Sequence, residues 1–149
     1  MKYEKEISNR LNELIEKNMN AKEGYSKAID KVENSEVKSF FKHCAEERAR
    51  FVKELRAEVW GTGEIPENSG NITGEIHRNW MSLKAAFSSN NEEAMLEETL
   101  RGEKSSLEEY NEMLSNASMP ISITNILRKQ RNSIEATISK AENFEAVSA

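Results

Sequence analysis

The chain has 149 residues, of which 37% are hydrophobic and 32% are charged, and its formal net charge is −5. This length suits one domain (1–149), and no apolar run approaches the roughly 20 residues that a transmembrane helix requires. The acidic balance argues against nucleic acid as a partner, because binding to a phosphate backbone requires a basic surface.

The sequence also carries information on the subcellular location of the protein. The first ten residues lack the apolar segment of a signal peptide. The single cysteine, Cys44, has no second cysteine with which to form an internal disulfide, which fits a reducing compartment. We therefore expect a cytoplasmic protein that has no membrane partner.

The first half of the chain predicts two long helices. Apolar residues recur at steps of three and four over residues 4–33 and again over residues 36–60, which is the spacing of an amphipathic helix. Asn34 can cap the start of the second helix, and Gly61 is a natural stop after its last turn.

The second half predicts a loop followed by three more helices. Residues 61–73 are rich in glycine and polar residues and contain Pro66, as an exposed loop would be. A short helix is expected over 74–88, and two long ones over 91–115 and 120–145, because apolar residues again recur at helical spacing.

The four long helices have similar lengths, which favours a single all-α four-helix bundle. At about 1.5 Å per residue each is roughly 40 Å long. Short turns make the helices over 4–33 and 36–60 an antiparallel hairpin, and those over 91–115 and 120–145 a second one. The connection over 61–90 is long enough to run along the bundle, which gives the ferritin-like arrangement of two hairpins joined by a crossover.

Each long apolar stripe is interrupted near its midpoint by a polar residue. The interruptions are Asn18, Arg48, Glu103 and Arg131, with Glu47 and Gln130 close beside them. A bundle would bring these residues into one central polar layer, the level at which metal-binding bundles place their ligands. Because a buried charge without a partner is very unfavourable, we expect the members of this layer to satisfy one another.

Three interpretations of this layer remain open. In the first, Glu103 accepts hydrogen bonds from Arg48, Arg131 or both, and the layer is structural. In the second, Glu103, Glu47 and His77 form a partial site for iron or another divalent metal. The Glu-x-x-His pairs of a two-metal centre are missing, and arginine repels a cation. In the third, the layer contacts a small bound molecule.

Catalytic patterns are missing from the sequence. It contains no G-x-S-x-G motif and no phosphate-binding loop, so we assign no catalytic residue and expect no cofactor. Gly24 and Gly102 lie inside predicted helices, where glycine is unfavourable by about 1 kcal/mol relative to alanine. Either the cost is simply tolerated, or another backbone, from the crossover helix or a second subunit, approaches closely there. The position of Gly102 off the inner stripe favours close approach, and we expect a homo-oligomer, with a dimer as the simplest form.

Four segments resemble a bacterial family of ferritin-like four-helix-bundle proteins that is catalogued as a domain of unknown function. They are NxxxGY in the first helix, AEERARF in the second, HRNWMSLKAA in the predicted crossover and RGE in the next long helix. The resemblance covers about residues 8–140. It implies a ferritin-like fold, a cytosolic setting and a link to stress responses, without an established activity. It maps Glu23, Glu47, His77 and Glu103 as metal candidates.

Overall fold

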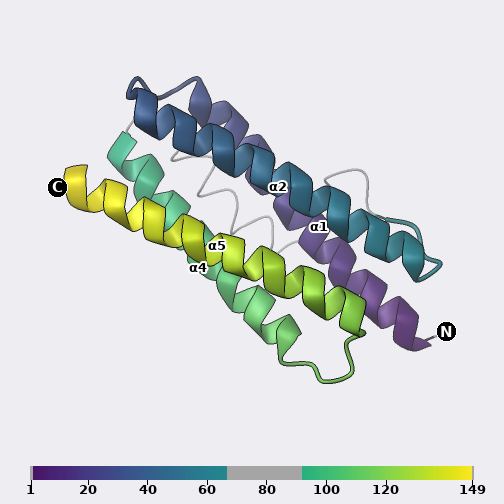
Figure 1. Ribbon diagram of the computed structural model, residues 1–149. Coiled ribbons are helices and arrows are strands. Elements are labelled where there is room, and N and C mark those ends of the chain that lie inside the picture. Colours follow the sequence, from purple (N-terminus) through teal and green to yellow (C-terminus); the bar gives the residue numbers. More distant parts are fainter. Residues whose placement is uncertain (1, 67–91, 149) are drawn as a thin grey trace.

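A computed structural model describes residues 2–66 and 92–148, and these residues form four long α-helices with no strand among them (Figure 1). The helices are α1 (Lys2–Ile29), α2 (Ser35–Gly61), α4 (Glu92–Leu114) and α5 (Ile121–Ser148). The prediction of four long helices is confirmed, and each begins within two residues of its expected start. The expected helix over 74–88 lies outside the described residues.

The ends of α2 follow the local chemistry that the sequence predicts, with one difference. The Asn34 side chain accepts hydrogen bonds from the backbone N–H groups of Glu36 and Val37, at 2.9 and 3.2 Å, as an N-cap does. Gly61 is the last helical residue, but the left-handed conformation falls on Gly63, whose φ is +86°. Glycine adopts this conformation without the steric penalty of a side chain, so the chain turns away from the helix there.

The end of α1 differs from the prediction. The helix stops at Ile29 rather than at residue 33, and the Lys31 N–H donates to the Ala28 carbonyl at 3.0 Å in a turn. Val32, which lies just past the end of the helix, is still 96% buried because the turn folds it into the core.

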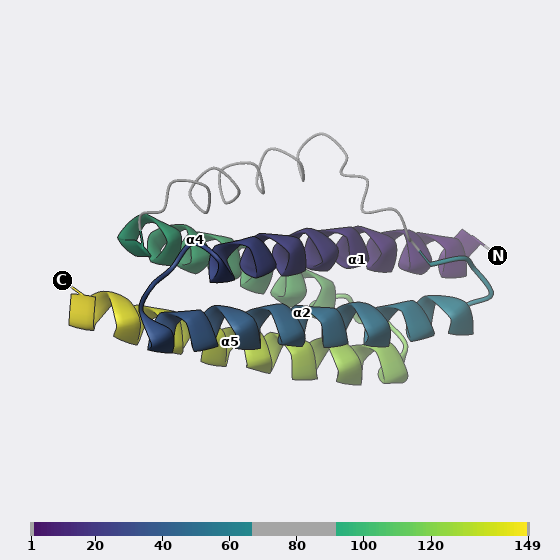
Figure 2. The same ribbon diagram turned by 90° about the horizontal axis from the view of Figure 1, so that it is seen from above.

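Neighbouring helices run antiparallel around the bundle (Figure 2). The closest packing is within the hairpins α1–α2 and α4–α5, and α2 also lies along α5. Residue numbers rise on α1 as they fall on α4 in the hydrogen-bonded or ion pairs Arg10–Glu112, Asn18–Tyr110 and Tyr25–Glu103. They run oppositely on α2 and α5 as well, in the pairs Glu47–Thr137 and Glu54–Gln130.

The apolar core consists of two clusters, one toward each end of the bundle. The first surrounds Tyr25, Phe40 and Phe41 near the α1–α2 turn, where the Phe40 and Phe41 ring centroids are 5.7 Å apart. The second surrounds Leu11 and Phe51 near the opposite end. The polar layer lies between these clusters, so that its side chains are enclosed by apolar residues from both ends.

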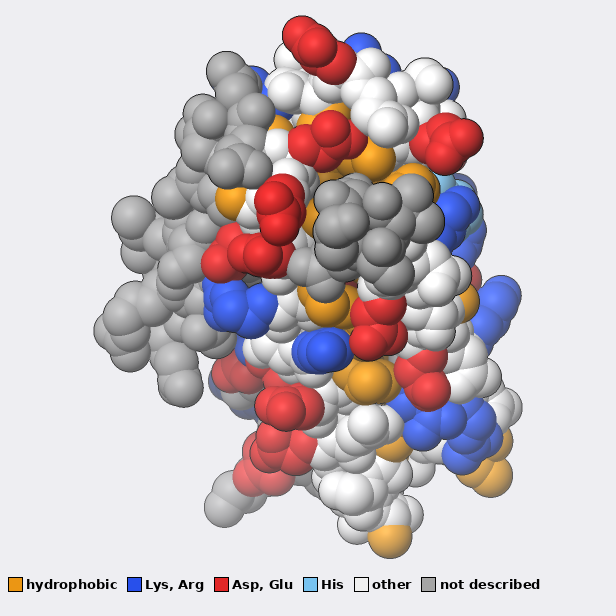
Figure 3. Space-filling view, turned by 90° about the vertical axis from the view of Figure 1, so that its left-hand side faces the viewer, with side chains coloured by type: hydrophobic (Ala, Val, Ile, Leu, Met, Phe, Trp, Pro, Cys, Tyr) orange, Lys and Arg blue, Asp and Glu red, His pale blue; other side chains and the backbone are white. Residues whose placement is uncertain are grey.

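Charged side chains of both signs lie at the surface. Figure 3 shows acidic and basic groups interspersed over one face, with small apolar areas between them. Within residues 2–66 and 92–148, no helix combines the length and the apolar character that crossing a membrane would require.

Candidate functional site

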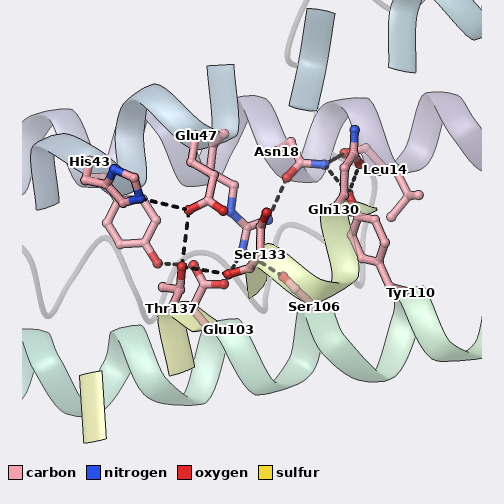
Figure 4. Close-up of polar contacts among 12 residues, drawn as sticks. Leu14, Asn18, His43, Glu47, Glu103, Ser106, Tyr110, Gln130, Ser133 and Thr137 are labelled. Carbon is pink, nitrogen blue, oxygen red and sulfur yellow. Dashed lines mark hydrogen bonds and ion pairs between the residues drawn. The ribbon is translucent and has the colours of Figure 1, made fainter. Parts of the chain in front are cut away.

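The centre of the polar layer is the guanidinium group of Arg48 on α2, a residue that is 98% buried. Its Nη1 donates to Asn18 Oδ1 on α1 at 2.6 Å (Figure 4). Its Nη2 donates to Glu103 Oε2 on α4 at 2.6 Å and approaches Ser106 Oγ at 3.4 Å. One side chain therefore connects three helices, using the planar array of donors that distinguishes arginine from lysine.

The carboxylate of Glu103 is engaged at both of its oxygens. Oε2 accepts from Arg48, and Oε1 accepts from the Tyr25 hydroxyl on α1 at 2.5 Å. Both contacts are short, and hydrogen bonds to a carboxylate are generally shorter and stronger than those between neutral groups. Glu103 is thus held from two sides within an enclosed part of the bundle.

The network continues through Tyr110 to the fourth helix. Asn18 Nδ2 donates to the Tyr110 hydroxyl at 3.2 Å, and that hydroxyl donates to Gln130 Oε1 on α5 at 2.6 Å. Gln130 Nε2 then donates to Glu54 Oε1 at 3.0 Å and to the Phe51 carbonyl at 3.4 Å. The chain of contacts therefore joins all four helices and ends at the partly exposed Glu54.

Burial and the Arg48–Glu103 pair determine the protonation of the layer. Burial, reinforced by Glu103, raises the pKa of Tyr25 well above its usual value, and burial raises the pKa of Tyr110 to about 12. For Arg48, burial alone would lower the pKa, but the charge of Glu103 opposes this and the net shift is upward. At neutral pH the phenols are protonated and Arg48 carries its positive charge.

Glu47 forms a smaller contact beside the layer, one turn from its surface neighbour His43. Its Oε2 accepts from the Thr137 hydroxyl on α5 at 3.2 Å and lies 3.8 Å from His43 Nε2. Burial raises the pKa of Glu47, Arg48 opposes the shift, and the negative charge of Glu103 adds to it. Arg48 therefore lies near two acidic side chains but contacts only Glu103 directly. The negative charge of Glu47 is balanced by Arg48 from a greater distance.

Replacing Glu47 with glutamine should stabilise the protein at pH 7 by on the order of 1 kcal/mol. Because its folded-state pKa is raised, ionised Glu47 opposes folding at neutral pH, and this opposition disappears as the pH falls through the raised pKa. The amide oxygen can still accept from Thr137. Thermal unfolding between pH 5 and 7 should show the advantage of Glu47→Gln shrinking toward acid.

The exposed neighbour Glu46 provides the matched control, since Glu46→Gln makes the same chemical change outside the core. That variant should differ little from the parent at either pH. A Glu47→Gln protein that is less stable than the parent at pH 7 would contradict the assignment of an under-compensated charge.

Of the six residues predicted for the layer, four come together, Glu47 lies beside them, and Arg131 lies elsewhere. Asn18, Arg48, Glu103 and Gln130 belong to one hydrogen-bonded network. The placement of Arg131 is wrong, because its side chain is 29% exposed and lies 3.4 Å from Glu135. The buried stripe of α5 passes through Gln130 instead, and its members are Ile123, Leu127, Gln130, Ile134, Thr137, Ile138 and Ala141. Arg131 lies at the edge of this stripe, where a long side chain can extend to solvent.

The sequence reasoning missed the two tyrosines of the layer. Tyr25 and Tyr110 belong to the apolar stripes by their spacing, yet the Tyr25 hydroxyl donates to Glu103 and the Tyr110 hydroxyl joins Asn18 to Gln130. A signal was present, because a buried tyrosine hydroxyl usually finds a hydrogen-bond partner. Tyr25 follows Asn18 by seven residues, and Tyr110 follows Glu103 by seven, which places each pair two turns apart on one helical face.

The metal candidates are dispersed. Glu103 and Glu47 lie in the interior with the partners described above, whereas Glu23 is exposed and forms an ion pair with Lys27 at 3.0 Å. His77 lies outside the described residues. Within the described ranges, no three histidine, cysteine or acidic residues are grouped so as to hold one metal ion. The metal interpretation stays a prediction, since it includes His77.

Two hollows in the surface lie away from the layer. One, of about 450 Å³, is lined at the α1–α2 turn and the start of α4 by residues that include Asp30, Glu33 and Glu92. The other, of about 190 Å³, lies between α1 and α4 beside Lys17 and Glu109. No member of the polar layer lines either hollow, so neither supports the interpretation of the layer as a small-molecule site.

Comparison with protein families gives one match. A family model described as a domain of unknown function (DUF2383) matches residues 6–116, which include most of α1 and all of α2 and α4. The match therefore includes Asn18, Arg48, Glu103 and Tyr110 and stops before Gln130. Comparisons with curated proteins and with solved structures each found no match.

Proposed function

This chain belongs to the DUF2383 family, a domain of unknown function, and we propose that it is a non-catalytic helical scaffold whose centre is closed by an ion pair. The observation that carries the proposal is the contact between Arg48 Nη2 and Glu103 Oε2 at 2.6 Å. Metal-binding bundles hold cations at this level, and here a protein cation takes that position.

Electrostatics favours the ion pair over a metal at this position. A metal bound by Glu103 would displace hydrogen bonds from Arg48 and Tyr25. The displaced guanidinium would then remain buried beside a second cation, and an unpaired buried charge is strongly destabilising. The upward shift of the Arg48 pKa also means that the group does not become neutral to relieve this repulsion.

The ends of the hairpins support a ferritin-like connection for this scaffold. After α2 the chain approaches the first half of α1, where Asn12 Nδ2 lies 3.4 Å from the Ile65 carbonyl. The start of α4 lies at the other end of the bundle, where Glu92 shares a hollow with Asp30 and Glu33. These two points lie toward opposite ends of the bundle, as the two ends of the crossover do in a ferritin-like fold.

The measurement that tests this proposal is metal content. The protein, purified without chelators or a nickel column and then loaded with ferrous iron under argon, should retain only substoichiometric metal. Glu103→Ala should retain no less than the parent, and Glu108→Ala, which removes an exposed carboxylate from the same helix, should behave in the same way. Stoichiometric metal that disappears in Glu103→Ala alone would overturn the proposal and favour the divalent-metal site.

The biological setting of the scaffold remains a prediction. The sequence favours a cytoplasmic, stress-related protein that associates with itself, and a scaffold without its own chemistry is compatible with such a role. The Arg48–Glu103 ion pair is relevant to self-association, because it determines which helical hairpins can pack against each other.

A further inference from the structure

The two hairpins contribute opposite charges to the layer. The α1–α2 hairpin provides the cation Arg48, and the α4–α5 hairpin provides the anion Glu103. The neutral members are also divided, since Asn18 comes from the first hairpin and Tyr110 and Gln130 from the second. The hydrogen bonds that complete the network therefore cross the boundary between hairpins at 2.6 Å for Arg48–Glu103 and at 3.2 Å for Asn18–Tyr110.

This division makes the hairpins complementary to each other but not to themselves. Two α1–α2 hairpins packed together would bring two Arg48 side chains into one layer, and two α4–α5 hairpins would do the same with Glu103. Like charges in a buried layer repel strongly, so both arrangements are excluded by electrostatics. An α1–α2 hairpin therefore accepts only a hairpin that carries the Glu103 carboxylate.

Nothing in these contacts depends on both hairpins belonging to one molecule. They are joined only through residues 62–91, and the closest helix packing lies within each hairpin. We propose that this chain self-associates by exchanging hairpins, so that α1–α2 of one copy closes on α4–α5 of a second copy. Each layer of the dimer then takes Arg48 from one chain and Glu103 from the other. The inference rests on the proposed function, because it requires an ion pair rather than a metal at the centre.

The closed monomer and the exchanged dimer contain the same layer contacts, so their balance depends on concentration. Because the two hairpins of one chain are covalently linked, they meet in an intramolecular step, which favours the closed monomer at low protein concentration. We therefore expect dilute protein to be largely monomeric and the dimer to form when chains fold together at high concentration. A pair of complementary substitutions should shift the equilibrium between monomer and dimer toward the dimer far enough to be measured.

The test combines two chains that are each defective alone. Arg48→Met leaves Glu103 without its cation, and Glu103→Met leaves Arg48 without its anion. If equal amounts are unfolded together and refolded, the exchanged heterodimer contains one native Arg48–Glu103 layer and one layer with a methionine in both positions. We expect native mass spectrometry to detect a dimer with one chain of each kind. Its melting temperature should lie within about 5 °C of the parent, with each variant alone melting well below it.

The double variant Arg48→Met/Glu103→Met is the matched control. Both of its hairpins are uncharged at the layer, so it should fold as a monomer and form no preferential dimer with either single variant. A mixture that shows only the two separate variants, without a heterodimer and without recovered thermal stability, would overturn the exchange. Metal content shows separately whether the proposed function fails. If Glu103 holds a metal, the parent should contain stoichiometric metal and Glu103→Met should contain none.

Discussion

Replacing Glu103 with methionine should lower the free energy of unfolding by about 3–5 kcal/mol, because it leaves the buried guanidinium of Arg48 without a counter-charge. Arg48 retains its contacts with Asn18 at 2.6 Å and Ser106 at 3.4 Å, but both partners are neutral. The same substitution also removes the acceptor of the Tyr25 hydroxyl. Urea unfolding followed by circular dichroism would measure the loss as a lower midpoint.

Two further variants isolate the charge from the change of side-chain shape. Glu108→Met alters an exposed carboxylate on the same helix and should change stability by less than about 0.5 kcal/mol. Arg48→Met/Glu103→Met removes both charges and should recover most of the loss, as uncharged replacements of buried ion pairs commonly do. A double variant as unstable as Glu103→Met would show that lost packing or the stranded Tyr25 hydroxyl, and not an unpaired charge, accounts for the effect.

Tyr110→Phe should have the next largest effect, with a loss of about 2–3 kcal/mol, because one hydroxyl serves two buried amides. It accepts from Asn18 at 3.2 Å and donates to Gln130 at 2.6 Å, so its removal leaves the Gln130 amide oxygen without this donor. Asn18 Nδ2 loses one of its two bonds and keeps the one to the Leu14 carbonyl at 2.9 Å. The phenyl ring still fills the same volume, which separates hydrogen bonding from packing. Equilibrium urea unfolding is again the appropriate measurement.

A double-mutant cycle with Gln130→Leu would test whether the hydroxyl acts through the network. In a protein that already carries Gln130→Leu, Tyr110→Phe leaves no Gln130 amide oxygen without a donor. The stability losses of the two single variants should therefore sum to more than the loss of the double variant. Strictly additive losses would contradict the hydrogen-bonded connection between α4 and α5.

The arrangement of the helices and the position of the layer could be predicted because both follow from periodicity. Apolar residues at steps of three and four locate four helices, and short turns make hairpins of them. Arg48 and Glu103 interrupt the centres of their stripes, and burial at that position leaves ion pairing as the favourable outcome. The sequence did not decide which arginine pairs with Glu103, but the structure identifies it as Arg48.

The remaining details depend on side-chain geometry that periodicity does not contain. Gln130 and Arg131 are adjacent and both lie near the inner face of α5, and a rotation of the helix by part of a turn decides which one enters the core. Tyr25 and Tyr110 pack as apolar rings along most of their length, so only the partners of their hydroxyls place them in the layer. Those partners come from other helices and become apparent only in three dimensions.

The mutual dependence of Arg48 and Glu103 has an evolutionary consequence. A lineage that loses either residue first passes through a protein with a stranded interior charge, and selection removes such intermediates when they unfold. Two coordinated changes are needed to leave this state, and they seldom arise together. The pair can thus persist in descendants because neither residue can change alone, even where the original advantage of the charges has been lost.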